Sequence, residues 1–252
     1  PSLNVPWYSV LGNHDVQGNA SALVAYTTVD PQRRWFMPAR NYTAQVCAHA
    51  AAAGGAGCIQ YVFLDTNVVQ ADHLCNQDDD CVQKMKEAWA SQLQWAEETL
   101  GKSTATWKIV VGHHPVFNAA HHGDSELLKS TLRPMLERRH VQLYLCGHEH
   151  DLQHHQDGGV TYVISGGGSM VSTETPLNDK HPTLQWGRLT YGFTLNVVHG
   201  SDSMEIFFVD KTGRECLHKA KVDALPPARA RPQDPRARRG VSSGNICCVL
   251  IV

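Results

Sequence analysis

The sequence lacks both a long apolar run and an excess of charge of one sign. No stretch approaches the roughly 20 apolar residues with which a helix crosses a bilayer, so the residues as given predict no transmembrane helix. The 22 Lys and Arg residues nearly balance the 24 Asp and Glu residues, and the formal charge of −2 gives no reason to expect a nucleic-acid partner. The hydrophobic content of 42% and the charged content of 18% are ordinary for a globular chain, and 252 residues suffice for one large domain.

The two ends of the sequence differ from its middle. The chain begins at Pro1 without an initiator methionine, which predicts a processed or incomplete chain with any secretory signal upstream. From Lys221 the composition shifts to Pro, Ala and Arg, so we predict one domain over residues 1–220 and a disordered tail over residues 221–252. The tail ends in apolar residues around Cys247 and Cys248, which do not form a prenylation box. A truncated membrane anchor, acylated cysteines and an end without function stay open, and membrane association is expected only through this tail.

Four of the eight cysteines are placed to form two bridges. One pair would face each other if residues 42–47 and 58–64 form a hairpin, and the other pair flanks an acidic loop: Cys47 with Cys58, and Cys75 with Cys81. We favour disulfides over free thiols, which indicates an oxidising compartment. Glycosylation sequons at Asn19 and Asn41 agree with this interpretation. The expected location is therefore the secretory pathway, as a secreted, lysosomal or cell-surface protein.

Three apolar segments each end in a glycine followed by residues able to bind a metal ion. The segments 5–11, 107–111 and 141–146 read as buried strands, and they lead into Gly12-Asn13-His14-Asp15, Gly112-His113-His114-Pro115 and Gly147-His148-Glu149-His150. Glycine lets the backbone turn and approach a ligand closely where the chain leaves a sheet. Residues i and i+2 of an extended strand point the same way, which predicts that His148 and His150 lie side by side. If the strands share one sheet, Asn13, His113, His148 and His150 converge on one rim.

Other patterns predict the elements around these motifs. Helices are expected over residues 21–28 with Asn19 or Ser21 as the cap, 82–100 with Gly101 as the stop, and 125–139. Residues 42–47 and 58–64, 152–157 and 160–165, and 187–198 and 204–209 read as antiparallel strand pairs. Residues 31–40, 72–80 and 169–185 read as loops. No Lys-Ser or Lys-Thr follows Gly166-Gly167-Gly168, so these glycines indicate close backbone packing and not a phosphate loop.

The order and spacing of the three motifs resemble those of the metallophosphoesterases, and the details resemble the purple (tartrate-resistant) acid phosphatases. The resemblance runs from about residue 10 to residue 209 and includes Phe63-Leu64-Asp65-Thr66, Gln92-Leu93-Gln94-Trp95 and Tyr162-Val163-Ile164-Ser165-Gly166. It implies an α/β fold, a four-layer sandwich of two mixed β-sheets flanked by helices, which would here be incomplete at the N-terminus. It also implies hydrolysis of phosphate monoesters by a monomer that acts on small phosphorylated substrates or phosphoproteins.

The resemblance further implies a di-metal centre that joins Fe(III) to Fe(II), Zn or Mn. Two cations can clamp a phosphoryl group and lower the pKa of a shared water. By resemblance Asn13, His113 and His148 would hold the divalent ion, and His150 the iron. The catalytic residues implied are His14 and His122, which would donate to the phosphate or protonate the leaving oxygen.

The sequence also departs from the family pattern. The family's two further aspartates and its tyrosine ligand precede the first motif, and no acidic residue precedes Gly12 here. The iron position should then be weak or empty, so the chain is either a fragment of a longer enzyme, which we prefer, or a protein that has lost one metal. His114 stands where many relatives carry tyrosine, and Leu127 where animal members carry a disulfide cysteine. A phosphodiesterase or phosphoprotein phosphatase of the same fold, or a silent relative that binds phosphorylated ligands, remain alternatives.

Overall fold

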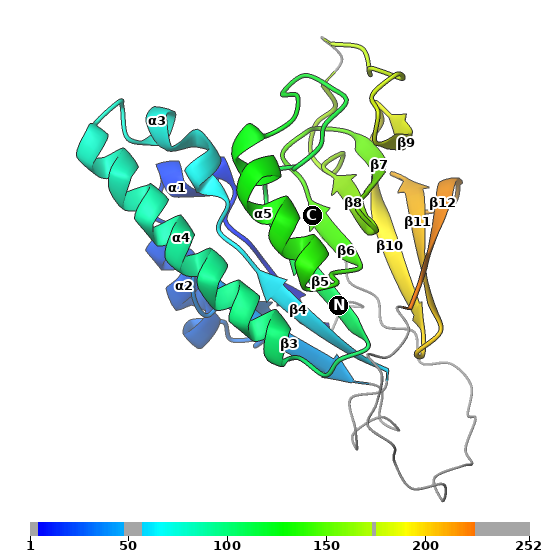
Figure 1. Cartoon of the computed structure of the whole chain (residues 1–252), viewed down its shortest axis with the longest axis horizontal. Coiled ribbons are helices and arrows are strands. Elements are labelled where there is room, and N and C mark those ends of the chain that lie inside the picture. The colour runs from blue at the N-terminus through cyan, green and yellow to red at the C-terminus, as the bar shows by residue number, and fades with distance from the viewer. Residues whose placement is uncertain (1–4, 48–56, 173–174, 225–252) are drawn as a thin grey trace, which may run out of the picture.

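A seven-stranded mixed sheet forms the centre of the computed structural model, which describes residues 5–47, 57–172 and 175–224 (Figure 1). The strand order is β3-β4-β5-β6-β8-β7-β9, in which β4, β5, β6 and β8 are parallel and β3 and β7 run antiparallel to their neighbours. The carboxyl ends of β4, β5 and β6 therefore share one edge, where ligand sites of such sheets lie. The bounds are β3 (Tyr42–Cys47), β4 (Cys58–Phe63), β5 (Trp107–Val111), β6 (Leu143–Cys146), β7 (Leu152–Asp157), β8 (Val160–Ser165) and β9 (Leu184–Arg188).

Two long helices cover one face of this sheet. The helices are α4 (Asp79–Lys102) and α5 (Glu126–Arg138), and both predicted helices are confirmed, although α4 continues through Gly101. Trp89 of α4 and Leu132 of α5 are buried in one core cluster with Tyr162 of β8. Each helix begins directly after an N-cap residue. The side chains of Asp78 and Ser125 accept hydrogen bonds from backbone N–H groups of the first turns of α4 and α5.

A three-stranded antiparallel sheet covers the other face. It consists of β10 (Gly192–His199), β11 (Ser203–Asp210) and β12 (Cys216–Asp223). Ile206 and Phe208 of β11 share a core cluster with Tyr61 and Leu145 of the large sheet. This second sheet is antiparallel and not mixed, and a fourth, helical layer on its outer face is not seen among the described residues. β12 was not predicted and continues past residue 220, whereas the rest of the predicted tail, residues 225–252, lies outside the described part.

The segment before the first motif differs most from its prediction. The strand expected over residues 5–11 is only β1 (Trp7–Tyr8), which pairs in parallel with β2 (Trp35–Phe36) in a separate two-stranded sheet. Pro6 lacks the N–H that a longer ladder would require, so the pairing starts at Trp7, whose N–H donates to the Arg34 carbonyl at 2.6 Å. Residues 31–40, predicted as a loop, supply β2.

Short helices complete the framework around the motifs. The first motif opens α1 (Asn13–Gln17), and α2 (Ala20–Val29) follows with Asn19 as its cap, as one of the two predicted alternatives stated. After β4 come η1 (Asn67–Gln70) and α3 (Ala71–Leu74), where an irregular loop was expected over residues 72–80.

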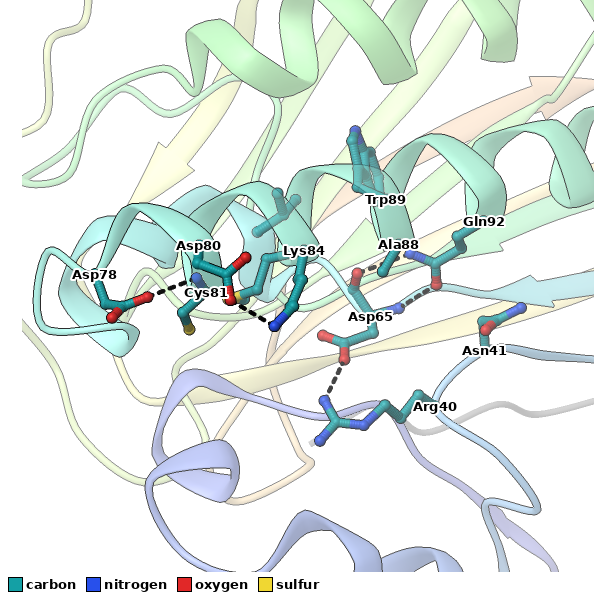
Figure 2. A pocket seen from close by; sticks show the side chains of 12 residues that line it. Arg40, Asn41, Asp65, Asp78, Asp80, Cys81, Lys84, Ala88, Trp89 and Gln92 are labelled. Atoms are coloured by element: carbon teal, nitrogen blue, oxygen red, sulfur yellow. Dashed lines mark hydrogen bonds and ion pairs between the residues drawn. The ribbon is translucent and has the colours of Figure 1, made fainter.

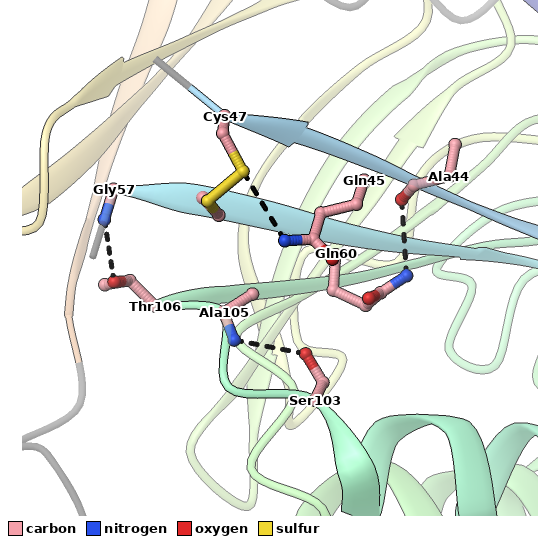
Figure 3. Close-up of a disulfide and its surroundings, with 9 residues drawn as sticks. Ala44, Gln45, Cys47, Gly57, Gln60, Ser103, Ala105 and Thr106 are labelled. Atoms are coloured by element: carbon pink, nitrogen blue, oxygen red, sulfur yellow. Dashed lines mark hydrogen bonds between the residues drawn. A yellow bond between two sulfur atoms is a disulfide. The ribbon is translucent and has the colours of Figure 1, made fainter. Parts of the chain in front are cut away.

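Both predicted disulfides are present. Cys47–Cys58 joins β3 to β4 at the ends of the predicted hairpin (Figure 3), and Cys75–Cys81 joins the end of α3 to the first turn of α4. Within the described ranges, no helix combines the length and the apolar character that crossing a membrane requires.

We expect the disulfide between β3 and β4 to contribute more stability than the one at α4. It closes 11 residues of chain against 6, and loop-closure entropy predicts losses of about 3 and about 2 kcal/mol respectively. The test compares urea unfolding of Cys47→Ala/Cys58→Ala with that of Cys75→Ala/Cys81→Ala. A larger loss in the second variant would contradict the entropic explanation.

A histidine pair links the two sheets. Nδ1 of His154 on β7 lies 3.1 Å from Nε2 of His218 on β12, and Trp186 stacks on the His218 ring with centroids 4.9 Å apart. Such a bond needs one nitrogen without a proton, and burial beside His218 lowers the pKa of His154 to about 4. The pair is therefore held together by neutral rings.

Acid should weaken this contact between the sheets. The pKa of His154 in the unfolded chain is about 6.5, above its folded value, so the stabilising effect is complete above pH 6.5 and is lost as pH falls toward 4. We expect the free energy of unfolding to fall less steeply over this range in His154→Leu than in the parent chain. A slope unchanged by this variant, measured by urea titration at several pH values, would contradict the assignment; His73→Gln, at an exposed position of α3, is the control.

Candidate active site

Three side chains from separate segments of the chain meet at the carboxyl edge of the large sheet. Nε2 of His113, in the loop after β5, lies 2.9 Å from Oδ1 of Asn13 and 3.2 Å from Nδ1 of His148. Asn13 opens α1, and His148 follows β6. The convergence predicted for these three residues is therefore confirmed, although the first of them does not come from a strand of the large sheet.

These side chains open onto a cavity of about 570 Å³. His148 has a left-handed backbone conformation with φ of +64°, so His148 and His150 do not point the same way as residues of one extended strand, which was the basis of their prediction. His150 nevertheless lines the same cavity. The other two predicted site residues, His14 and His122, line it as well. Several residues that were not predicted also line it: Trp7, Tyr8, Trp35, Ser165 and Ser169.

The Thr66 hydroxyl fixes the second motif. Its oxygen accepts the backbone N–H groups of His113 at 3.1 Å and His114 at 3.0 Å. Tyr144 donates its O–H to the His114 carbonyl at 2.7 Å. A Cβ on Gly112 would lie 2.4 Å from the Tyr144 hydroxyl oxygen, so glycine is required for this close approach.

His114 is close to the three residues but is presented differently. Ring nitrogens of His113, His114 and His148 lie within 4.8 Å of one another. However, Thr66 Oγ1 already accepts two N–H groups, so its own hydrogen is donated to Nδ1 of His114, 3.0 Å away. The neutral ring then carries its proton on Nε2, which is buried without a partner among the described residues. Such a nitrogen has no lone pair for a cation.

The environment keeps the converging imidazoles neutral. Burial, followed by the nearby rings of other histidines, lowers the pKa of His113 to about 4 and that of His148 to about 3. Their ring nitrogens can therefore offer lone pairs at neutral and mildly acidic pH, which metal ligation requires.

The two predicted catalytic histidines have different supports. Nδ1 of the exposed His14 lies 3.3 Å from Oε1 of Gln17. Asp15 does not contact His14 in the hydrogen bonds of the structure, and its Oδ2 instead accepts the Gly12 N–H at 2.7 Å as a helix cap. His122 is held by Glu149, whose Oε2 lies 3.0 Å from the His122 Nδ1. This hydrogen bond raises the pKa of His122.

The residues present fit one metal ion. Two ligands about 2.1 Å from an ion and at right angles to each other are about 3.0 Å apart, and the two separations around His113 Nε2 are 2.9 and 3.2 Å. An amide oxygen and two imidazoles suit a borderline divalent cation. A second ion does not fit equally well, because no cluster of three His, Cys, Asp or Glu side chains in the described ranges includes His150.

A second cavity of about 440 Å³ lies beside the first half of α4 (Figure 2). Arg40 pairs with Asp65 at 3.1 Å across it, and the Gln92 side chain bonds both the backbone N–H and the carbonyl of Asp65. The cavity contains none of the predicted site residues. Its polar groups hold the loop that ends in Thr66, so we assign it a structural role.

Comparison with known proteins identifies the family to which this geometry belongs. Residues 1–152 match the model of the calcineurin-like phosphoesterases. The chain belongs to the calcineurin-like phosphoesterase family. It is 33% identical over 243 residues to the tartrate-resistant acid phosphatase type 5 of Rattus norvegicus, covering 91% of this chain and 69% of that protein. It is 35% identical over 175 residues to purple acid phosphatase 7 of Arabidopsis thaliana, covering 67% of this chain and 50% of that protein.

Two solved structures share the fold. The chain superimposes with a TM-score of 0.70 and 23% identity on GAP50, described as the anchor in the inner membrane complex of Plasmodium, covering 88% of this chain and 67% of that one. Purple acid phosphatase PPD1 of yellow lupin gives a TM-score of 0.57 at 13% identity, covering 93% of this chain and 43% of that one. The predicted α/β class with a large mixed sheet is confirmed.

Sequence reasoning missed the residues that support the phosphoesterase site. Thr66 and Glu149 stand inside quoted motifs, but their partners, the backbone of the second motif and the ring of His122, are distant in sequence. Trp7 and Tyr8 carry no motif at all. Only the position of Glu149 between two histidines could have suggested a role.

The close packing predicted at the glycine triplet is confirmed at Gly166 and Gly167 and can be tested. A Cβ on Gly166 would lie 1.9 Å from the Glu149 carbonyl oxygen. Gly166→Ala must therefore displace the turn that carries His148 and His150, and we expect a loss of about 2 kcal/mol or more in urea unfolding. The control is Gly147→Ala on the same turn, where a Cβ meets nothing within 4 Å. Equal losses in the two variants would contradict this explanation.

Proposed function

We propose that this phosphoesterase hydrolyses phosphate monoesters, as an acid phosphatase that acts on small phosphorylated substrates or phosphoproteins. The meeting of Asn13, His113 and His148 beside a cavity that three further histidines line carries the proposal. The names of the relatives, tartrate-resistant and purple acid phosphatases, support the same chemistry.

In this proposal Asn13, His113 and His148 hold the divalent ion, which is Fe(II), Zn or Mn, and His150 belongs to the trivalent iron. A metal centre of this kind neutralises phosphoryl charge and supplies a hydroxide nucleophile at low pH. His150 alone cannot hold a hard trivalent ion, which prefers oxygen ligands. The proposal therefore requires carboxylates or a phenolate from outside the described residues.

The chain's own residues supply binding and proton transfer. Two histidines from different segments line the cavity: His14 from the first motif and His122 from the loop before α5. A protonated imidazole there can bind a phosphoryl oxygen and donate its proton to the leaving oxygen. The pKa of His122, raised by Glu149, favours the protonated form in mildly acidic solution.

We also propose a location in the secretory pathway for a monomeric enzyme. The two disulfides among the described residues support an oxidising compartment. The sequons at Asn19 and Asn41 support it as well, since Asn19 is exposed and Asn41 partly so.

A silent relative that binds phosphorylated ligands is the second candidate. The observation in its favour is that no carboxylate in the described part joins His150 in a cluster of potential ligands. A phosphodiesterase or phosphoprotein phosphatase of the same fold would share the site, and a panel of substrates separates these activities.

Metal content and turnover test the proposal together. The chain is loaded with iron and with zinc or manganese, and its metal content is measured beside hydrolysis of p-nitrophenyl phosphate and of bis-p-nitrophenyl phosphate. We expect preference for the monoester, and a loss of about 100-fold or more in His113→Ala and in His148→Ala, because each variant lacks a residue that would hold the ion needed for the reaction.

The matched control is His121→Ala, which removes a neighbouring histidine that faces Thr175 and not the cavity. It should retain turnover. One bound equivalent of metal with phosphate binding but no turnover would favour the silent relative, and preference for the diester would favour the phosphodiesterase.

A further inference from the structure

Glu149 is a buried carboxylate between two of the proposed metal ligands. Glu149 is 0% exposed, and one oxygen of its carboxylate, Oε2, accepts hydrogen bonds from three N–H groups. These are Asn118 Nδ2 at 2.6 Å, the His122 backbone N at 3.0 Å and the His122 ring Nδ1 at 3.0 Å. Two of the three donors belong to the same histidine, so the carboxylate holds both the backbone and the ring of His122 by hydrogen bonds.

The hydrogen bond to Glu149 determines which ring nitrogen of His122 carries its proton. A carboxylate oxygen accepts, so Nδ1 must carry a hydrogen. Nε2 is then the nitrogen that remains free to exchange a proton, on a ring that lines the cavity 4.4 Å from the His148 ring, measured between centroids. His14 has only a 3.3 Å contact with the Gln17 amide oxygen, and its ring is exposed.

The backbone around Glu149 is itself fixed. Its N–H donates to the Gly147 carbonyl at 2.8 Å, and its carbonyl accepts the Asp151 N–H at 2.9 Å. Asn118, which also bonds the carboxylate, is held through its Oδ1 by the Gln153 side chain at 2.8 Å. The turn that sets the positions of His148 and His150 therefore also sets the position of the Glu149 carboxylate.

We propose that Glu149 is a positioning residue that aligns His122 as the proton donor to the leaving oxygen of the substrate. The proposal rests on the proposed function and deepens it, by ranking His122 above His14 for this step. In the step, the bond between phosphorus and the ester oxygen breaks and its electron pair stays on that oxygen. The oxygen takes the proton from Nε2 of His122, and the ring becomes neutral and is reprotonated from solvent through the open cavity.

Leaving-group dependence separates this role from a merely structural one. An alkyl alcohol needs a proton as it leaves, whereas p-nitrophenolate does not. We expect Glu149→Gln and His122→Ala to lower kcat at least about tenfold more on an alkyl phosphate such as glycerol 2-phosphate than on p-nitrophenyl phosphate. The double variant should be no worse than His122→Ala, because both changes remove one function.

The control is Glu126→Gln, which removes an exposed carboxylate paired with Lys129 on α5 and should change neither substrate's kcat. Equal losses on the two substrates in Glu149→Gln, an effect on KM alone, or additive effects in the double variant would overturn the proposal. Thermal melting of each variant identifies any that fails to fold.

A second measurement does not depend on turnover. Nitrogen-15 NMR of the histidine side chains in the metal-free chain should show His122 with its proton on Nδ1, and Glu149→Ala should move it toward Nε2, the usual site in free imidazole. A proton on Nε2 in the parent chain, or no change in the variant, would overturn the proposal. If the parent chain hydrolyses neither substrate, the proposed function fails while this spectrum still decides the role of Glu149.

Discussion

The position of the whole site depends on one hydroxyl group, that of Thr66. It accepts two consecutive backbone N–H groups of the second motif, and this holds His113 where its ring reaches both Asn13 and His148. Thr66 is itself fixed from behind, because the Gln92 side chain of α4 bonds both backbone groups of the preceding Asp65. The packing of α4 against the sheet therefore also determines where the His113 side chain lies at the edge of the sheet. A buried hydroxyl can do this because each of its hydrogen bonds replaces one that water would otherwise make.

Burial then determines the charge of each group at this edge. The rings of His113 and His148 are neutral because a buried cation is costly and neighbouring rings would repel it. Glu149 has the opposite behaviour: burial opposes its charge, yet hydrogen bonds, chiefly from His122, lower its pKa to about 2. Asp151, two residues further along, is equally buried but accepts a side-chain hydrogen bond only from Gln153 among the described residues. Burial therefore raises the pKa of Asp151 to about 7. The turn thus presents the neutral His148 imidazole toward the cavity and the Glu149 anion behind His122.

The sequence was informative where a local pattern fixes the structure and silent where distant residues do. The strand over residues 107–111 and the hairpin over residues 152–157 and 160–165 matched their predictions, because a short apolar run and a Gly-Gly turn are local signals. The two disulfides followed from cysteine spacing. The first strand was wrong, since the apolar run around Pro6 finds its partner in β2 and not in the large sheet. Thr66 and Glu149 could not have been assigned, because nothing in their own neighbourhoods shows that they contact His113 and His122.

The carboxylates of the described chain are distributed in a way that limits its metal chemistry. Asp15 caps α1, Glu149 is engaged by His122 and Asn118, and Asp151 lies buried beside Gln153. Among the described residues, none of them joins His150 in a cluster of three potential metal ligands. The half of the centre formed by an amide oxygen and two imidazoles needs no such ligand, because a borderline divalent cation accepts nitrogen donors. In the proposed centre, one connected set of hydrogen bonds would therefore place both the residues assigned to the divalent ion and the proposed proton donor, and a trivalent ion would depend on oxygen ligands that this set does not contain.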